Sequence, residues 1–295
     1  MNALSSFIQY IKYEKRFSPH TVDAYNSDLE QFFLFLDVTY EVKEIEKATH
    51  PMIRSWIVSM MENGTTPRSI NRKLSTLKTF YKFLLRNETI TVNPMQKIQA
   101  PKTSKRLPVF VEESAMKLLF EEVDFGEGFA AVRDRLLMEI FYATGMRLAE
   151  LINLKEKDFD LANGQVKVLG KRNKERIIPF TREVRQMIKE YLALKSKQSF
   201  SFPSEHVFVA KDGKPMNRKA VYTLVKKYLS AVSTIDKRSP HVLRHTFATH
   251  MLNHGADINS IKEILGHANL SATQVYTHNT IEKLKQVYKQ AHPRA

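Results

Sequence analysis

The segment SPHVLRHTFATHML, residues 239–252, decides how the second half of the chain is organised. Its large apolar side chains recur every four positions, at Leu243, Phe247 and Met251. This spacing predicts a helix with one buried stripe, because residues four apart lie on the same helical face. His241 lies three residues from Arg244 and four from His245, so a polar face is expected beside the buried one. A histidine and an arginine on such a face can together bind a phosphate.

The histidines do not predict a metal site. The chain has no His-Glu-x-x-His motif and no cysteine, which are the usual sources of zinc ligands. We therefore expect no bound metal and interpret His245 and His250 as structural groups. The absence of cysteine also excludes disulfides and thiolate catalysis, and it fits a reducing compartment, so a cytoplasmic protein is expected.

The charge of the chain favours a polyanionic partner. Its 295 residues include 46 Lys and Arg against 31 Asp and Glu, a net charge of +15, which makes nucleic acid the first candidate. A membrane is not expected. No apolar run approaches the roughly 18 residues of a membrane span, and the N-terminus lacks a basic segment followed by an apolar one.

Residues 1–97 predict a compact helical bundle. Ser18 can cap a helix whose first turn holds Pro19, and apolar residues then repeat every three or four positions. Two further helices are expected after it, the first ending at Gly64. Residues 98–107 are rich in basic residues, include a proline and lack a hydrophobic period. They indicate an extended linker between two domains.

Residues 108–295 predict a second domain that is mostly helical and contains a small antiparallel sheet, so the fold class is mainly α. Short apolar runs between 157 and 180, split by Asn163-Gly164 and by a basic tip, predict the sheet. The last helix has a face that carries Ile281, Leu284 and Val287 or Tyr288. That face suits docking on a neighbouring protomer, or packing within the same chain.

Arg147 is the first candidate for binding an anion. Gly145 is expected to break the helix before it, which would leave Arg147 near a helix N-terminus, where anions are favoured. Glu150, three residues on, can hold the guanidinium. On its own, the pattern also fits an ordinary surface arginine.

Basic residues cluster at the tip of the predicted hairpin, namely Lys171, Arg172, Lys174 and Arg176. Such a tip suits a nucleic-acid groove, or it is a solvated turn. It is not a phosphate loop, because five residues separate Gly164 from Gly170 and Arg172 stands where a magnesium-binding Ser or Thr is needed. Four cations in and beside the linker are expected to contact DNA backbone: Lys97, Lys102, Lys105 and Arg106.

Tyr276 is a candidate nucleophile. It follows His267 by nine residues in LGHANLSATQVYTH, just after a short segment that Ser271 can cap. A helical tyrosine is usually a core residue. As a nucleophile it needs activation, because a phenol with a pKa near 10 is almost fully protonated at neutral pH.

The motifs taken in order resemble the catalytic domain of the tyrosine recombinases: TGMRLAEL, GKRNKER, HVLRHTFATH and LGHANLSATQVYTH. The N-terminal stretches SPHTVDAYNSDLEQFFLFL and RSINRKLSTLKTFYKFL extend the resemblance over nearly the whole chain, closest to the Xer-type members. It implies two domains that clamp duplex DNA, the first with a SAM-like core-binding fold. It also implies strand exchange through a covalent 3′-phosphotyrosyl intermediate.

The resemblance further implies a role for each candidate. Tyr276 would be the nucleophile, while Arg147 and Arg244 would grip the non-bridging oxygens of the scissile phosphate. Lys171 would be the general acid for the departing 5′ oxygen. The remaining roles fall to His241 in proton transfer, His267 as a hydrogen-bond donor to the phosphate, and Glu150 as a support for the site.

No cofactor is expected for this chemistry. Two guanidiniums can offset the charge that builds on the phosphate, and a phosphotyrosyl linkage conserves the energy of the broken bond. One position departs from the family pattern: Arg172 stands where a glycine is expected, which would alter the hairpin tip and its minor-groove contact.

The expected partner is double-stranded DNA with paired recombination sites, bound by a homo- or hetero-tetramer on two duplexes. The resemblance leaves open whether the role is chromosome dimer resolution or integration and excision of a mobile element. It also leaves open whether a paralogous recombinase or a DNA translocase takes part. Two alternatives remain at this point, a DNA-relaxing enzyme of the type IB topoisomerase kind and a non-catalytic DNA-binding regulator.

Overall fold

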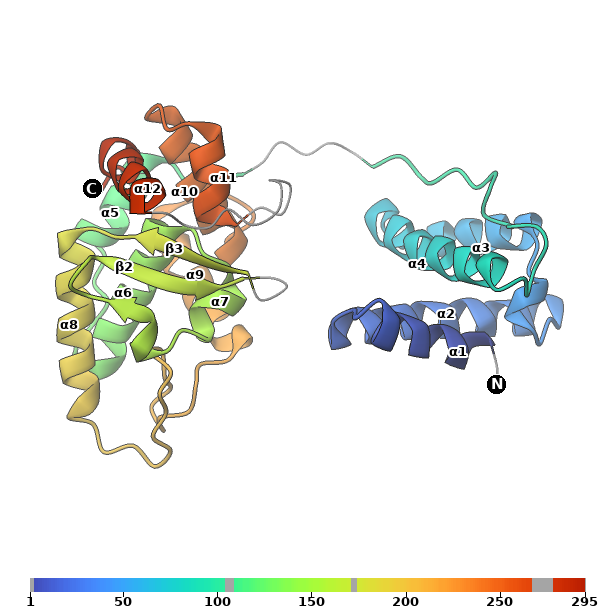
Figure 1. Cartoon of the computed structure of the whole chain (residues 1–295), viewed down its shortest axis with the longest axis horizontal. Helices are drawn as coiled ribbons and strands as arrows, with labels where there is room; N and C mark the ends of the chain where they lie inside the picture. Colours follow the sequence, from blue (N-terminus) through green and yellow to red (C-terminus); the bar gives the residue numbers. More distant parts are fainter. Residues whose placement is uncertain (1–2, 104–108, 171–173, 267–277, 295) are drawn as a thin grey trace. The chain divides into compact units, whose positions relative to one another are not determined.

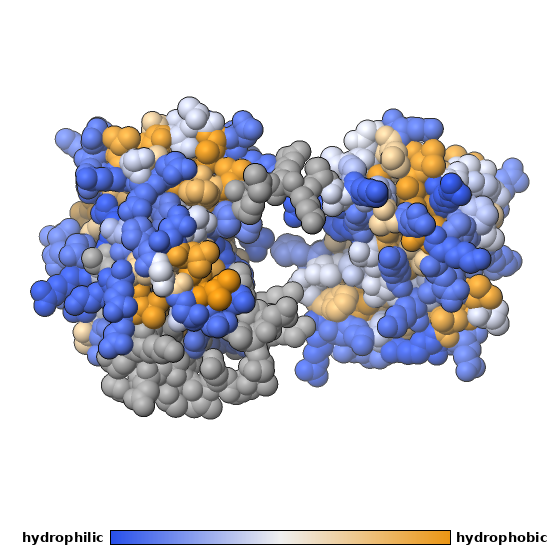
Figure 2. Space-filling model, turned by 90° about the horizontal axis from the view of Figure 1, so that it is seen from above, coloured by the Kyte–Doolittle hydropathy of each residue, from blue (hydrophilic) through white to orange (hydrophobic). Residues whose placement is uncertain are grey.

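The computed structural model of the chain describes residues 3–103, 109–170, 174–266 and 278–294, with the backbone alone over 278–284. The chain forms two compact units, residues 1–106 and 107–295 (Figure 1). Hydrophilic residues cover much of the visible surface of each unit, with smaller apolar patches between them (Figure 2). None of the described helices is long and apolar enough to cross a membrane.

The first unit is a bundle of helices. Its elements are α1 (Ala3–Gln9), which continues as a π-helical turn (Tyr10–Glu14), α2 (Pro19–Tyr40), a short 3₁₀ turn (Ile45–Lys47), α3 (His50–Glu62) and α4 (Pro67–Arg86). Ser18 caps α2 as predicted, because its hydroxyl accepts a hydrogen bond from the Thr21 backbone N–H at 3.3 Å. Buried aromatic side chains fill the core, among them Phe7, Phe32, Phe80 and Tyr81.

A buried carboxylate joins α2 to α4. Asp28 is 1% exposed and accepts hydrogen bonds from both Nη atoms of Arg72, at 2.5 and 2.6 Å. Lys73 Nζ and Thr76 Oγ1 donate to the same carboxylate at 3.1 and 2.9 Å. A charge this deeply buried is tolerated only when it is paired and fully hydrogen-bonded, so the cluster fixes the two helices in register.

The second unit is built of helices around a small sheet. Its elements are α5 (Glu113–Glu121), α6 (Gly128–Thr144), α7 (Leu148–Ile152), a 3₁₀ turn (Glu156–Asp158), β1 (Phe159–Asp160), β2 (Gln165–Leu169), β3 (Glu175–Pro179), α8 (Arg182–Ser196), α9 (Arg218–Val232), α10 (Pro240–Asn253), α11 (Ile258–Leu265) and α12 (His278–Ala291). Helix α6 is buried almost all round and packs against α8 and α10, so it forms the centre of this unit.

The predicted sheet is confirmed. Its strands are antiparallel in the order β1-β2-β3, and Leu169 pairs with Glu175 where the hairpin closes. The turn before β2 uses Gly164 at φ +65°, a left-handed conformation that suits glycine. Side chains alternate along β2 and β3, so that Val166, Val168 and Ile178 point into the core.

Tyr288, one residue of the face predicted on the terminal helix, packs within its own unit, whereas the side chains of Ile281 and Leu284 lie outside the described part of the chain. Tyr288 is 3% exposed within the core of the unit, and the ring of His292 stacks on it with centroids 4.8 Å apart. His292 Nε2 donates to the Tyr142 carbonyl at 3.2 Å, and burial lowers the pKa of His292 to about 4. A neutral imidazole therefore anchors the end of the chain at neutral pH.

Candidate active site

Arg147 begins helix α7 immediately after a sharp break in the chain. Gly145 ends α6 at φ +57°, and a Cβ on it would lie 2.4 Å from Phe247 Cδ1, so α10 packs directly on this backbone. Arg147 then occupies the N-cap of α7, and its backbone N–H donates to Glu150 Oε2 at 2.7 Å. Its Nη1 donates to Glu150 Oε1 at 2.8 Å, so the predicted pairing with Glu150 is confirmed.

Arg244 reaches the same place from α10. The residue is 7% exposed, and its Nη1 donates to the Gly145 carbonyl at 2.7 Å. Its Nη2 donates to the Leu265 carbonyl, also at 2.7 Å. Arg244 therefore ties the break before Arg147 to the end of α11, although these positions lie far apart in the sequence.

The interior position of Arg176 corrects a prediction. We expected this residue to contact DNA, but it is 3% exposed and makes a bidentate ion pair with Glu150, at 3.0 and 2.8 Å. Its Nε donates to the Ile264 carbonyl at 2.7 Å. Arg176 shares the inward face of β3 with Ile178, two residues further along the strand. Because side chains of a strand alternate between its two faces, this spacing in the sequence could have predicted that Arg176 is buried.

Three guanidiniums thus meet at the C-terminal end of α11. Arg176, Arg244 and Arg147 each donate to one of the successive carbonyls of residues 264, 265 and 266, the last at 3.0 Å. The last carbonyls of a helix lack partners within it and carry partial negative charge, so cations stabilise this end. Glu150 pairs with Arg147 and Arg176, while Arg244 donates to two carbonyls, so these four side chains together carry net positive charge.

The charges of the cluster perturb one another. The pKa of Arg244 is lowered to about 10. Burial is the main cause, and the positive charges of Arg147 and Arg176 add to it. Burial alone would raise the pKa of Glu150, but the hydrogen bonds and charge of Arg176, together with the hydrogen bonds from Arg147, lower it below its usual value. Arg244 and Glu150 are therefore both charged at neutral pH, and an added anion would relieve the repulsion that the neighbouring arginines exert on Arg244.

The histidines of α10 take different positions. His241 is exposed in the first turn, one turn before Arg244. His245 is half-buried, and burial followed by the charge of His241 lowers its pKa. His250 is 2% exposed, and its Nδ1 lies 2.9 Å from Tyr142 Oη in a hydrogen bond, which fits the structural role expected for it.

Several predicted residues lie outside the part of the chain that the structure describes: Lys105, Arg106, Lys171, Arg172, His267, Ser271 and Tyr276. Their places in the sequence still connect them to the cluster. Gly170 precedes Lys171, and Gly266 precedes His267. The Gly170 N–H donates to the Lys174 carbonyl at 2.8 Å, and the side chain of Lys174 is exposed beside this hydrogen bond.

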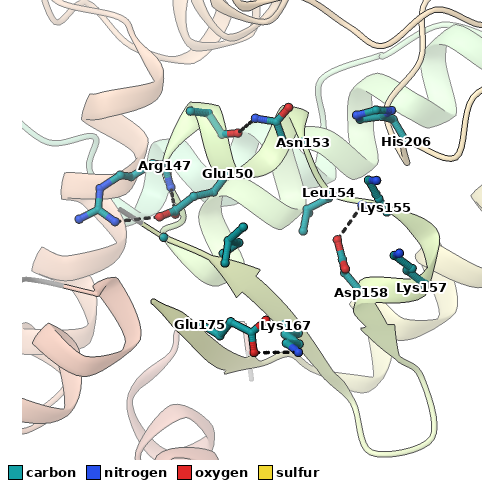
Figure 3. A pocket seen from close by; sticks show the side chains of 13 residues that line it. Arg147, Glu150, Asn153, Leu154, Lys155, Lys157, Asp158, Lys167, Glu175 and His206 are labelled. Atoms are coloured by element: carbon teal, nitrogen blue, oxygen red, sulfur yellow. Dashed lines mark hydrogen bonds and ion pairs between the residues drawn. The ribbon is translucent and has the colours of Figure 1, made fainter. Parts of the chain in front are cut away.

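A hollow of about 840 Å³ opens beside Arg147 and Glu150 (Figure 3). Its lining includes Lys155, Lys157 and Lys167, three cations that the sequence analysis did not select. Lys155 pairs with Glu205, and Lys167 pairs with Glu175 at 2.8 Å. Lys155 and Lys157 lie at the 3₁₀ turn and Lys167 lies in β2. Because they do not form one basic run in the sequence, the sequence pattern did not indicate them.

The described residues hold no group of three His, Asp or Glu side chains placed to bind a metal ion. The chemistry that the arrangement offers is electrostatic. Arg147 and Arg244 present charged donors at one place, and that place is continuous in sequence with the segments that carry Lys171, His267 and Tyr276. Such donors suit a phosphate group whose negative charge grows during reaction.

Comparison with known proteins identifies the class. The family model described as the phage integrase family matches residues 109–283, and the model of the phage integrase N-terminal SAM-like domain matches residues 4–88. The chain therefore belongs to the phage integrase family, the tyrosine recombinases, and site-specific recombination is its activity.

Particular relatives carry the name tyrosine recombinase XerC. The chain is 40% identical to the one from Bacillus licheniformis, over 100% of this chain and 97% of the relative. It is 38% identical to the one from Bacillus subtilis, with the same coverage. These full-length matches favour a recombinase over the topoisomerase and the non-catalytic regulator.

Solved structures share the fold. The post-cleavage complex of the XerH recombinase with a palindromic difH substrate matches with a TM-score of 0.73 and 22% identity, over 96% of this chain and 83% of that one. The Tn1549 transposon integrase in complex with transposon right end DNA matches with a TM-score of 0.71 and 19% identity, over 97% and 99% of the two chains. The mainly helical fold with a small antiparallel sheet is thereby confirmed.

Proposed function

We propose that this protein cuts and rejoins duplex DNA through a covalent 3′-phosphotyrosyl intermediate, with Tyr276 as the nucleophile. The observation that carries the proposal is the meeting of Arg147 and Arg244 at the end of α11, in a cluster with more positive than negative charge. A phosphodiester placed there would gain charge-assisted hydrogen bonds. The order of the candidate residues in the sequence supplies the rest of the site.

In the proposed step, the phenolic oxygen of Tyr276 forms a bond to phosphorus, and the bond from phosphorus to the 5′ oxygen breaks. His241 accepts the phenolic proton, and Lys171 gives a proton to the departing oxygen. Each such proton transfer typically contributes about 10²- to 10⁴-fold. Arg147 and Arg244 stabilise the charge on the non-bridging oxygens, and His267 donates a further hydrogen bond to the phosphate. Reversal of the step on another strand rejoins the DNA.

We propose double-stranded DNA with paired recombination sites as the substrate, bound by a tetramer, which accords with the DNA-bound state of the XerH and Tn1549 structures. The first unit serves as the core-binding domain over residues 1–97, and residues 108–295 form the catalytic domain. The names of the XerC relatives favour chromosome dimer resolution with a paralogous recombinase, within the cytoplasm. In the tetramer, the face of α12 that carries Ile281 and Leu284 in the sequence would dock on a neighbouring protomer.

The test is covalent capture. Purified protein is incubated with fragmented DNA of its source, the mixture is denatured, and DNA that stays attached to protein is sequenced. A single recurrent motif is expected, and a nicked duplex with that motif should accumulate the adduct because the nick releases the fragment needed for religation. Failure to recover covalently attached DNA would contradict the proposed chemistry.

The basic residues around the linker give a prediction for DNA affinity. Lys97 and Lys102 are exposed, and Asn71 holds the backbone between them by donating to the Pro101 carbonyl at 3.0 Å. We expect the combined alanine variant of Lys97, Lys102, Lys105 and Arg106 to bind DNA with a shallower dependence on salt. The slope of log K against log salt should fall by about three to four, since each phosphate contact contributes about 0.9.

The measurement is a salt titration of binding to the captured site. The control replaces Lys189 and Lys197 with alanine, since both are exposed, the first on α8 and the second at its C-cap. Helix α8 lies at the opposite end of the sheet from the end of β2 and the start of β3 (Figure 1). This control should keep the wild-type slope. An unchanged slope in the linker variant would show that these residues do not contact phosphates.

A further inference from the structure

Each nitrogen of the Arg176 guanidinium donates a hydrogen bond to a protein group. Nε donates to the Ile264 carbonyl, Nη1 donates to Glu150 Oε1, and Nη2 donates to Glu150 Oε2, all within 3.0 Å. The residue is 3% exposed. A side chain in this state has no accessible face to offer to DNA, so its function must act through its neighbours.

The first neighbour connects Arg176 to Arg147. Glu150 accepts two hydrogen bonds from Arg176 and two from Arg147, one of them from the Arg147 backbone at 2.7 Å. The carboxylate is 5% exposed at its side chain, so it is held entirely by these two arginines and the surrounding core. Arg176 therefore fixes the orientation of the group that orients Arg147.

Two glycines connect Arg176 to the segments that follow them. A Cβ on Gly266 would lie 3.1 Å from Arg176 Cδ and 3.2 Å from its Nε, and Gly266 has φ +66°. A Cβ on Gly170 would lie 3.4 Å from Arg176 Nη1. The backbone thus rests directly on the Arg176 side chain at both places. In the sequence Gly170 is followed by Lys171 and Gly266 by His267, so Arg176 lies beside the residue that precedes each of these two candidates.

We propose that Arg176 is a positioning residue for DNA cleavage, which aligns Arg147 through Glu150 and lies against the backbone at Gly170 and Gly266. The proposal rests on the proposed function, because it assigns these residues to the same reaction. It predicts a defect in the cleavage step with binding intact, since displacement of a catalytic group by about 1 Å can cost about 10²-fold in rate.

The decisive variant is Arg176→Lys, which keeps the positive charge and removes the fork that pairs with both oxygens of Glu150. Cleavage of the nicked duplex is measured in single turnover with protein in excess, and affinity is measured separately. Because the rate constant at saturation does not depend on the fraction of folded protein, it separates positioning from stability. We expect it to fall by about 100-fold while affinity for DNA stays unchanged.

The matched control is Arg133→Lys. Arg133 is also a buried arginine of this unit, 8% exposed, and it pairs with Asp134 and the Val209 carbonyl away from the cluster. It should lose thermal stability and keep its cleavage rate constant. Equal losses of affinity and cleavage in Arg176→Lys would overturn the proposal in favour of a DNA contact. A wild-type rate constant in that variant would overturn it in favour of a structural role.

A second variant covers the case in which Arg176→Lys does not fold. Gly170→Ala retains every charged group and adds one methyl group against Arg176 Nη1 and the Lys174 carbonyl, at 3.4 and 3.2 Å. A slower cleavage rate constant with unchanged affinity is expected, and an unchanged rate constant would overturn the proposal. Wild-type protein that forms no adduct would contradict the proposed function itself, which distinguishes the two failures.

Discussion

Replacing Tyr276 with phenylalanine is expected to abolish the covalent adduct on a nicked duplex and to leave affinity for DNA unchanged. The substitution removes one oxygen atom, which is the atom that would bond to phosphorus. Binding to DNA arises mainly from Lys and Arg side chains that contact the phosphates, so loss of the tyrosine hydroxyl is not expected to alter it. A nucleophile forms the covalent bond itself, so if Tyr276 has this role the expected loss of adduct is complete.

The adduct is measured as protein that stays attached to labelled DNA after denaturation, and affinity is measured by gel shift. Tyr222→Phe is the matched control, because this tyrosine is 47% exposed on α9 in the same unit. It should form the adduct at the wild-type rate. Adduct that survives in Tyr276→Phe would show that another side chain attacks the phosphate.

Replacing Arg244 with alanine is expected to slow cleavage by about 10²- to 10³-fold, the usual cost of removing a donor that binds developing charge. The loss should exceed any loss of affinity, because the contact strengthens as charge grows on the phosphate. The structure adds a second consequence. The carbonyls of Gly145 and Leu265 lose their buried donor, which typically costs about 1–3 kcal/mol of stability.

Both consequences are measured on the same protein. Single-turnover cleavage at saturating protein gives the catalytic loss, and thermal unfolding gives the loss of stability. Arg133→Ala is the control, since it also removes a buried arginine that donates to a carbonyl, that of Val209 at 3.0 Å. It should lose stability without the catalytic loss. If Arg244→Ala lost binding and cleavage to the same extent, a role specific to the transition state would be ruled out.

The two predictions differ in their effect on stability, because only Arg244→Ala removes contacts that hold the fold together. Arg244 is part of the architecture as well as of the site, because it joins the ends of α6 and α11 through two carbonyls. Burial, followed by the charges of Arg147 and Arg176, lowers the pKa of Arg244 to about 10, and we expect a bound phosphate to offset the repulsion among these arginines. We expect such a group of guanidiniums to bind a phosphate through charge-assisted hydrogen bonds.

Local patterns in the sequence determined much of the fold. Apolar residues at helical spacing, the cap at Ser18, the break at Gly145 and the turn at Gly164 each act over a few residues, so they can be predicted without knowledge of distant contacts. The order of Arg147, Arg244 and Tyr276 along the chain likewise indicated the family, because the order of motifs can be read directly from the sequence.

Only the tertiary structure decided which charged side chains face outward. Arg176 belongs to a run of basic residues that read as a DNA-facing hairpin tip, yet it points inward because Glu150 lies beneath β3 and neutralises it. That partner comes from a helix start 26 residues away, and burial of a guanidinium is favourable only once such a partner is in place. Local spacing determined the helices, the sheet and the candidate residues of this protein, whereas long-range pairing of charges decided which of them form the cluster.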